Sequence, residues 1–319
     1  MTEFARFAVP FIGLVLLGYL AGRWRPIPPS GIRVLERLLF QFGLPALIFG
    51  ALADTPIGAI GDVPFILTVA FASYCAFAAA FTVAALRNGG DIPVATLHGL
   101  IGSQGRGALM APAIVLAAFG AAAGVPLAII LAVDIVLLQA LAPLLVAAAG
   151  ERERPAIVFR RIGLRIALDP IVIAAVAGVL YAATGLGLPA GVADLLGLLG
   201  GIAPALGLLL VGLSLSNRRT IDIPEDFLPA LAVKLFAHPI IVYLLLGWVG
   251  DFAEPWVFTA VMIAALPPAA QAVPAAARSI GNRAATAADL GLIASFVTLV
   301  ALGALLIAGV VPADPFPSA

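Results

Sequence analysis

Charged side chains are scarce in this sequence. They make up 11% of its 319 residues, whereas 63% are apolar and the mean hydropathy is +1.15. A soluble domain carries about 25% charged residues, so this chain cannot cover itself with a water-facing surface. The net charge is zero, and neither a basic nor an acidic tail indicates nucleic acid as a partner.

Residues for covalent and metal chemistry are equally few. Cys75 is the only cysteine, which excludes an internal disulfide and a cysteine-based metal cluster. The two histidines, His98 and His238, are too few for a histidine-rich metal site. We therefore expect no cofactor and no metal.

The apolar residues are grouped in runs of about 20, the length that crosses a bilayer as a helix. Proline, glycine or charged residues separate the runs, and Gly150–Leu168 is read as the longest link between them. The first run is read as a retained helix, because no small-x-small cleavage site follows it. The ten predicted spans are Phe4–Gly22, Val34–Leu52, Pro64–Leu86, Pro93–Gly120, Pro126–Ala149, Pro170–Thr184, Ala193–Ser214, Phe227–Val249, Trp256–Ser279 and Ala287–Val311.

Basic residues predict the orientation of these spans. The links after odd-numbered spans hold 14 of the 17 Lys and Arg residues. The links on the opposite side contain no Lys or Arg, and their charged residues are acidic, such as Asp54 and Asp251. Because basic loops stay in the cytoplasm, we expect both termini to face outward.

The two halves of the chain repeat weakly. An offset of 160 takes Pro10 to Pro170 and Gly18 to Gly178, and an offset of 162 takes Pro112 to Pro274. Each half would hold five spans, an odd number, so the second half would enter the membrane from the opposite face. The sequence thus predicts an all-α membrane protein of ten helices in a 5+5 inverted repeat, an architecture of alternating-access carriers.

Helices four and nine of this arrangement are predicted to be broken. Glycines cluster between Gly102 and Gly107 before Pro112, and span nine carries Pro267, Pro268 and Pro274. Glycine relaxes a helix and proline removes one of its donors, and backbone groups freed in lipid need protein or water as partners. Two such breaks in corresponding places point to a binding site at mid-membrane. The alternative is a pair of packing kinks.

Arg106 falls inside the first break, where a guanidinium group raises the free energy unless it is paired with an anion or hydrated. It could hold a substrate carboxylate with its planar fork, helped by the amino ends of half-helices, or it could pair with Asp134 or Glu36. Further candidates for ligand contact are Ser103, Gln104, Gly105, Gln271 and Pro267, whereas Pro112, Pro268 and Pro274 would keep the breaks open at the crossing.

Three titratable residues are candidates for proton or ion coupling: Asp134 in span five, and Lys234 and His238 in span eight. Lys234 and His238 are four residues apart and share a helix face. Lys234 could equally be a structural residue bonded to a broken-helix carbonyl.

Several segments together resemble the auxin efflux carrier family, whose bacterial members include malonate-type transporters. They are Pro10–Arg23, Phe42–Leu47, Lys234–Pro239, Ala265–Gln271 leading to Ala277-Arg278, and Ser295 with Thr298. The resemblance covers nearly the whole chain. One departure is that the family's usual Asn–Gly pattern in helix four is replaced here by Ser103–Gly107.

This resemblance implies a fixed scaffold and a mobile transport unit that moves like an elevator. The scaffold would be 1–57 (helices 1–2) and 163–217 (helices 6–7), and the transport unit 58–150 (helices 3–5) and 220–312 (helices 8–10). The resemblance also implies crossed helices four and nine that meet at Pro112 and Pro274, an organic-anion substrate, a homodimer and a bacterial inner membrane.

We accordingly expect a secondary or facilitative carrier of a small carboxylate or dicarboxylate, coupled to H⁺, to Na⁺ or to neither. One alternative is a Na⁺-coupled carrier similar to bile-acid symporters. A second is a membrane sensor that moves nothing, and a third is an intramembrane hydrolase using Ser103. No Gly-x-Ser-x-Gly or His-Glu-x-x-His motif supports the third.

Overall fold

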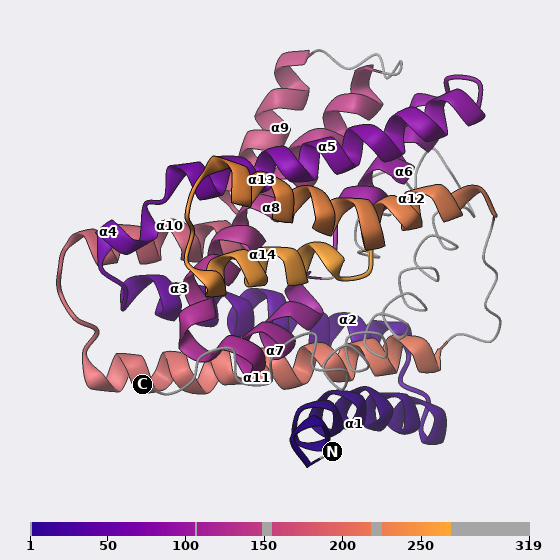
Figure 1. Ribbon diagram of the computed structural model, residues 1–319. Helices are drawn as coiled ribbons and strands as arrows, with labels where there is room; N and C mark the ends of the chain where they lie inside the picture. Colours follow the sequence, from indigo (N-terminus) through magenta and orange to yellow (C-terminus); the bar gives the residue numbers. More distant parts are fainter. Residues whose placement is uncertain (1, 106, 149–154, 218–224, 269–319) are drawn as a thin grey trace.

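The computed structural model describes residues 2–105, 107–148, 155–217 and 225–268. Within these ranges the fold is all-α, and the only pairing of strand type is an isolated bridge between Gly105 and Pro268. Helix α11 runs along one side of the molecule with α1 on its outside, and α5, α13 and α14 run roughly side by side across the view (Figure 1). The principal helices are α1 (Thr2–Trp24), α2 (Pro29–Leu38), α3 (Leu44–Ala53), α4 (Ile57–Ile60), α5 (Val63–Arg87), α6 (Ile92–Ser103), α7 (Gly107–Phe119), α8 (Gly124–Ala148), α9 (Pro155–Ala167), α10 (Pro170–Ala183), α11 (Ala190–Ser216), α12 (Leu228–Ala232), α13 (His238–Val249) and α14 (Glu254–Ala265).

Five helical segments of the described chain are long and apolar enough to cross a membrane, or six if α9 and α10 form one bent span. Many large apolar side chains point outward, among them Trp24, Leu86 and Trp248, which are 89%, 81% and 84% exposed. Such a surface suits lipid rather than water. An integral membrane protein is therefore confirmed. The count of ten spans stays a prediction, because span ten lies outside the described residues.

Residues 155–167, read above as part of a link, form helix α9. The helix begins at Pro155, a residue favoured at the first helical position, and its axis is bent 62° from that of α10. Val158 and Ile162, one turn apart, are buried, and α9 packs on α8. The arginines lower the hydropathy of this stretch to that of a link, although one side of the helix is apolar.

Two helices contain a π turn just before a proline. The N–H of Leu44 bonds to the Leu39 carbonyl ahead of Pro45, and the N–H of His238 bonds to the Val233 carbonyl ahead of Pro239. A proline has no N–H and its ring clashes with the carbonyl four residues earlier, and a bond to the fifth residue instead relieves that crowding. These prolines therefore widen their helices without ending them, over Leu39–Gly43 and Val233–Ala237.

Glycines bring two pairs of helices into close contact. A Cβ on Gly18 of α1 would collide with the Leu209 carbonyl of α11, and one on Gly207 of α11 would collide with the Leu109 carbonyl of α7. Small residues allow such approach between membrane helices.

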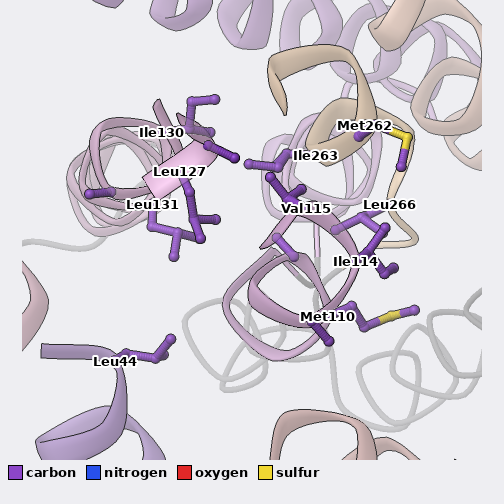
Figure 2. Packing of buried hydrophobic residues seen from close by; sticks show 14 of the residues in the cluster. Leu44, Met110, Ile114, Val115, Leu127, Ile130, Leu131, Met262, Ile263 and Leu266 are labelled. Carbon is purple, nitrogen blue, oxygen red and sulfur yellow. The ribbon is translucent and has the colours of Figure 1, made fainter. Parts of the chain in front are cut away.

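The apolar core nearest the break in span four is built from α7, α8 and α14. Figure 2 shows Val115 of α7 and Ile263 of α14 directed toward Leu127 and Ile130 of α8. All four side chains are at most 2% exposed, so the three helices form one packed unit. This unit fixes the amino end of α7 and the carboxyl end of α14 beside each other.

Candidate functional site

Span four is interrupted between α6, which ends at Ser103, and α7, which begins at Gly107. Gln104 is buried and extended, with φ −88° and ψ 127°. Pro112, expected at the break, instead lies inside α7, about one and a half turns after the helix starts. The glycines and not the proline therefore mark the interruption. Arg106 itself lies outside the described residues.

Span nine is interrupted after Ala265, where α14 ends. Leu266 is extended, with φ −65° and ψ 148°, because a residue that precedes a proline is driven out of the helical region. Pro267 and Pro268 follow and are both buried. The candidates Gln271 and Pro274 lie outside the described residues, as do Ser295 and Thr298.

The two interruptions meet. Gly105 and Pro268 form an antiparallel bridge, so the extended segments of spans four and nine lie against each other. The space at this meeting point is narrow. A Cβ on Gly105 would lie 3.2 Å from Nζ of Lys234 and 3.3 Å from the Ile263 carbonyl oxygen, which explains why glycine stands there.

Lys234, the only lysine of the chain, points into this meeting point from the π turn of span eight. It is 1% exposed, and its ammonium group donates hydrogen bonds to the Ser103 carbonyl at 3.1 Å and to Nδ1 of His238 at 3.0 Å. Ser103 is the last residue of α6, so the ammonium stands at the negative end of that helix. The structure thus shows the carbonyl contact that the sequence left as one alternative for Lys234.

His238 extends the same network toward α5. Because Lys234 donates to Nδ1, the proton of a neutral His238 ring is on Nε2. Nε2 lies 3.4 Å from the hydroxyl oxygen of Ser73, which can accept that proton in a hydrogen bond. Ser73 is buried, and no sequence pattern distinguishes it, since a serine in an apolar span usually bonds to its own helix.

Asp134 of α8 lies on the other side of the break. A Cβ placed on Gly107 would be 4.0 Å from Oδ2 of Asp134, which puts the carboxylate near the positive amino end of α7. Asp134 and Lys234 are also close enough for their charges to attract each other. Each half-helix end at the break therefore faces a side chain of opposite charge.

The remaining polar candidates divide into those at the site and those away from it. The Ser103 hydroxyl donates to the Gly99 carbonyl of its own helix at 3.0 Å, so its backbone and not its side chain serves the network. His98 is buried elsewhere, stacked on Phe227 with ring centroids 4.5 Å apart. Within the described residues, no group of three or more His, Cys, Asp or Glu side chains could hold a metal ion.

Comparison with known proteins identifies the family of this chain. The profile of the family described as "Membrane transport protein" matches residues 7–307. A protein of Rhizobium meliloti (strain 1021), named "Putative malonate transporter", is 32% identical over 321 residues, covering 99% of this chain and 100% of that protein. The resemblance to the auxin efflux carriers is thereby confirmed, and the chain belongs to this family of membrane transport proteins, as a transporter and not an enzyme.

Proposed function

We propose that this protein carries small organic anions, carboxylates or dicarboxylates, across the membrane by alternating access, with the substrate bound where spans four and nine meet. The observation that carries the proposal is the bridge between Gly105 and Pro268. The Ser103 carbonyl, the buried Lys234 ammonium and the Asp134 carboxylate gather there in a largely apolar interior. Such a polar site at a helix break is where carriers bind their substrates.

The position of this bridge supports the inverted repeat. The offset of 162 makes Gly105 equivalent to Pro267, and Arg106 equivalent to Pro268. Gly105 contacts Pro268, which is the equivalent of its own neighbour. Two equivalent segments that touch antiparallel within one residue of equivalence are what two inverted halves related by an approximate twofold axis would give.

A dicarboxylate of malonate size is our first choice of substrate. The name of the Rhizobium meliloti relative supports it, and so does the cationic side of the site at Lys234. Arg106 and the amino end of α7 would add donors for a carboxylate. Gln104 and Gln271 would orient the second carboxylate.

The contacts of Lys234 favour H⁺ over Na⁺ as the coupled ion. A carbonyl freed at a helix break is a ligand that transporters use for Na⁺, and here the Ser103 carbonyl already accepts from the Lys234 ammonium. Asp134 competes with a substrate anion for the amino end of α7, because both are negative. Protonation of Asp134 would remove this competition, so anion and proton would travel together.

Contacts among the described helices support a scaffold and a mobile unit. Helices α1, α3, α10 and α11 pack on one another, whereas α5, α6, α8, α13 and α14 pack around the break. The two groups meet where α8 packs on α3 and α10, and where α7 packs on α11 with Gly207 facing the Leu109 carbonyl. We place the moving boundary there, with elevator-type motion, a homodimer, the bacterial inner membrane and outward termini as parts of the same proposal.

Uptake by proteoliposomes tests the function directly. Vesicles containing the purified protein should accumulate radiolabelled malonate, faster when the external pH is lowered and regardless of Na⁺. A strict Na⁺ requirement would favour the carrier similar to bile-acid symporters. Binding of malonate without any accumulation would favour the sensor, and absence of both would reject the substrate class.

A further inference from the structure

An acidic cavity opens where the link between α13 and α14 lies beside α4 and the start of α5. Its volume is about 500 Å³, and Asp62, Asp251, Phe252 and Trp256 are among the residues that line it. Asp251 is exposed and Asp62 half-buried, and none of the described residues that line the cavity is basic. A cleft lined by negative charge concentrates cations and repels anions. The cavity therefore suits a proton better than a carboxylate substrate.

Three aromatic rings separate this cavity from the interior. Phe252 and Trp256 line it, and the fully buried Phe65 lies behind them, with ring centroids 5.7 Å from Phe252 and 4.8 Å from Trp256, both edge to face. The backbone N–H of Phe65 donates to Oδ1 of Asp62 at 3.0 Å, which ties the buried ring to the acidic lining. These rings would have to separate for an ion to pass inward.

The hydroxyl of Thr259, one turn further along α14, has no hydrogen-bond partner among the described residues. Its side chain is fully buried. Threonines of helices commonly donate to a carbonyl of the preceding turn, as Thr55 and Thr96 do here at 2.8 Å each. Because buried hydroxyls are normally hydrogen-bonded, an unpaired one inside an apolar unit marks a place where a passing group can be its partner.

Thr259 stands on a line that leads from the cavity to the break. Trp256, Thr259 and Ile263 lie within about 60° of one another around α14. Ile263 is directed toward α8 (Figure 2). A Cβ on Gly107 would lie 3.4 Å from Cγ2 of Ile263 and 4.0 Å from Oδ2 of Asp134. The inner end of the line therefore reaches the Asp134 carboxylate.

Few titratable groups face this line from the elements that pack on α14. These elements are α7, α8, α13 and the short helical segments Gly120–Ala123 and Val233–Ala237, and their described titratable residues are Asp134, Lys234, His238 and Tyr243. Lys234 and His238 are bonded to each other, and Tyr243 is 57% exposed. Asp134, whose charge Lys234 attracts, is the group among them that can take a proton at the end of the line.

We infer that this line along α14 is a proton route, separate from the path of the anion, from the acidic cavity past the Phe65–Trp256 contact and the Thr259 hydroxyl to Asp134. The inference deepens the function proposed above and rests on its assignment of the coupled proton to Asp134. A proton leaves the aqueous cavity, the Thr259 hydroxyl accepts one hydrogen bond and donates the next, and the Asp134 carboxylate becomes a carboxyl group. The aromatic rings keep the route closed to larger ions.

Thiol labelling tests the route without any substrate. Thr259→Cys and Ala260→Cys are made in the full-length protein in a Cys75→Ser background; both positions are buried, but residue 260 lies about 100° away around α14. In proteoliposomes, the cationic reagent aminoethyl methanethiosulfonate should modify Thr259→Cys about tenfold faster than Ala260→Cys, since the acidic cavity concentrates it. Adding Phe65→Ala should raise the rate at residue 259 alone. Equal rates at both positions, an equal rise at both, or no rise at either would overturn the route.

Thr259→Val tests the hydroxyl itself. It keeps the shape of the side chain and breaks no hydrogen bond recorded in the described structure, and Thr259→Ser is the control that restores the hydroxyl. Malonate uptake driven by a pH gradient should fall about tenfold in Thr259→Val, with an unchanged KM for malonate. Exchange of internal for external malonate should stay as in the wild type, because exchange requires no net movement of protons.

Three kinetic results would overturn the role of Thr259. They are unchanged gradient-driven uptake by Thr259→Val, an equal loss of uptake and exchange, and uptake by Thr259→Ser as slow as by Thr259→Val. A wild type that neither takes up nor exchanges malonate would count against the function proposed above, and the labelling rates would still decide whether the route exists.

Discussion

Replacing Lys234 with methionine removes the ammonium group from the meeting point while keeping a side chain of similar length. Nζ lies near Gly105, so a carboxylate bound beside Gly105 would be within about 6 Å of it. At an effective dielectric constant of about 20, that attraction amounts to about 3 kcal/mol. We therefore expect Lys234→Met to bind malonate about 100-fold more weakly and to take up almost none at low substrate concentration.

The fold should survive this change. The two hydrogen bonds that Lys234 donates, at 3.1 and 3.0 Å, contribute about 1.5–3 kcal/mol each when the donor is charged. Removing the ammonium relieves its own desolvation cost, but it leaves the Ser103 carbonyl, Nδ1 of His238 and the Asp134 carboxylate without their cationic partner, and such a loss costs about 3–5 kcal/mol in a buried pair. Thermal unfolding should accordingly move to lower temperature, so malonate binding is measured below the unfolding range of the variant. Lys234→Arg, which keeps the charge, is the control, and tight malonate binding by Lys234→Met would refute the assignment of the ammonium to the substrate.

Three further substitutions test the neighbouring parts of the site. Asp134→Asn imitates the protonated carboxyl group, so malonate uptake should lose its rise at low pH; a pH profile that matches the wild type would count against Asp134 as the proton carrier. Pro239→Ala should convert the π turn to regular helix and rotate Lys234 by about 100°, cutting uptake about tenfold or more, whereas Pro45→Ala at the other π turn should not; uptake assays would expose an equal loss in both. Gly207→Ala should cost about 1–3 kcal/mol of stability or arrest transport, because its Cβ would collide with the Leu109 carbonyl, whereas Gly201→Ala in the same helix, where nothing lies within 4 Å, should be neutral in thermal unfolding and uptake alike.

The breaks in spans four and nine could be predicted from the sequence, because glycine and proline act on the backbone locally. Leu266 is extended for the reason that any residue before a proline tends to be. The same reasoning placed too much weight on Pro112, which lies inside α7. A proline near the start of a helix loses little, since the first four N–H groups have no helical partner in any case, and Pro112 comes only shortly after them.

Other features depend on tertiary contacts that no local pattern reveals. Ser73 and His238 are 165 residues apart and meet only because α5 packs against α13. The spacing of Lys234 and His238 predicted a shared face, but not that a π turn would direct Lys234 toward the end of α6. Helix α9 was missed because three arginines in 13 residues lower its hydropathy to that of a link, although its covered side is apolar.

The opposite charges at the break explain how an anion could cross lipid at moderate cost. In the structure the Lys234 ammonium faces the carboxyl end of α6, and the Asp134 carboxylate lies near the amino end of α7, so both half-helix ends are compensated before any substrate arrives. An isolated ion in the bilayer is expensive, and a substrate carboxylate added to this balanced set would leave one negative charge uncompensated.

On the function proposed above, a proton taken up by Asp134 restores the balance, because the substrate then replaces the aspartate charge at α7 and the number of buried charges is unchanged. Lys234 and Asp134 alone would need one proton to hold a monocarboxylate in a neutral site. When the charge of Arg106, next to Gly105 in the chain, is counted in the site as well, one proton suffices for a dicarboxylate, so Arg106→Gln should impair malonate uptake more strongly than uptake of a monocarboxylate such as acetate. If Arg106→Gln reduced the uptake of both substrates equally in proteoliposomes, Arg106 would not bind the second carboxylate.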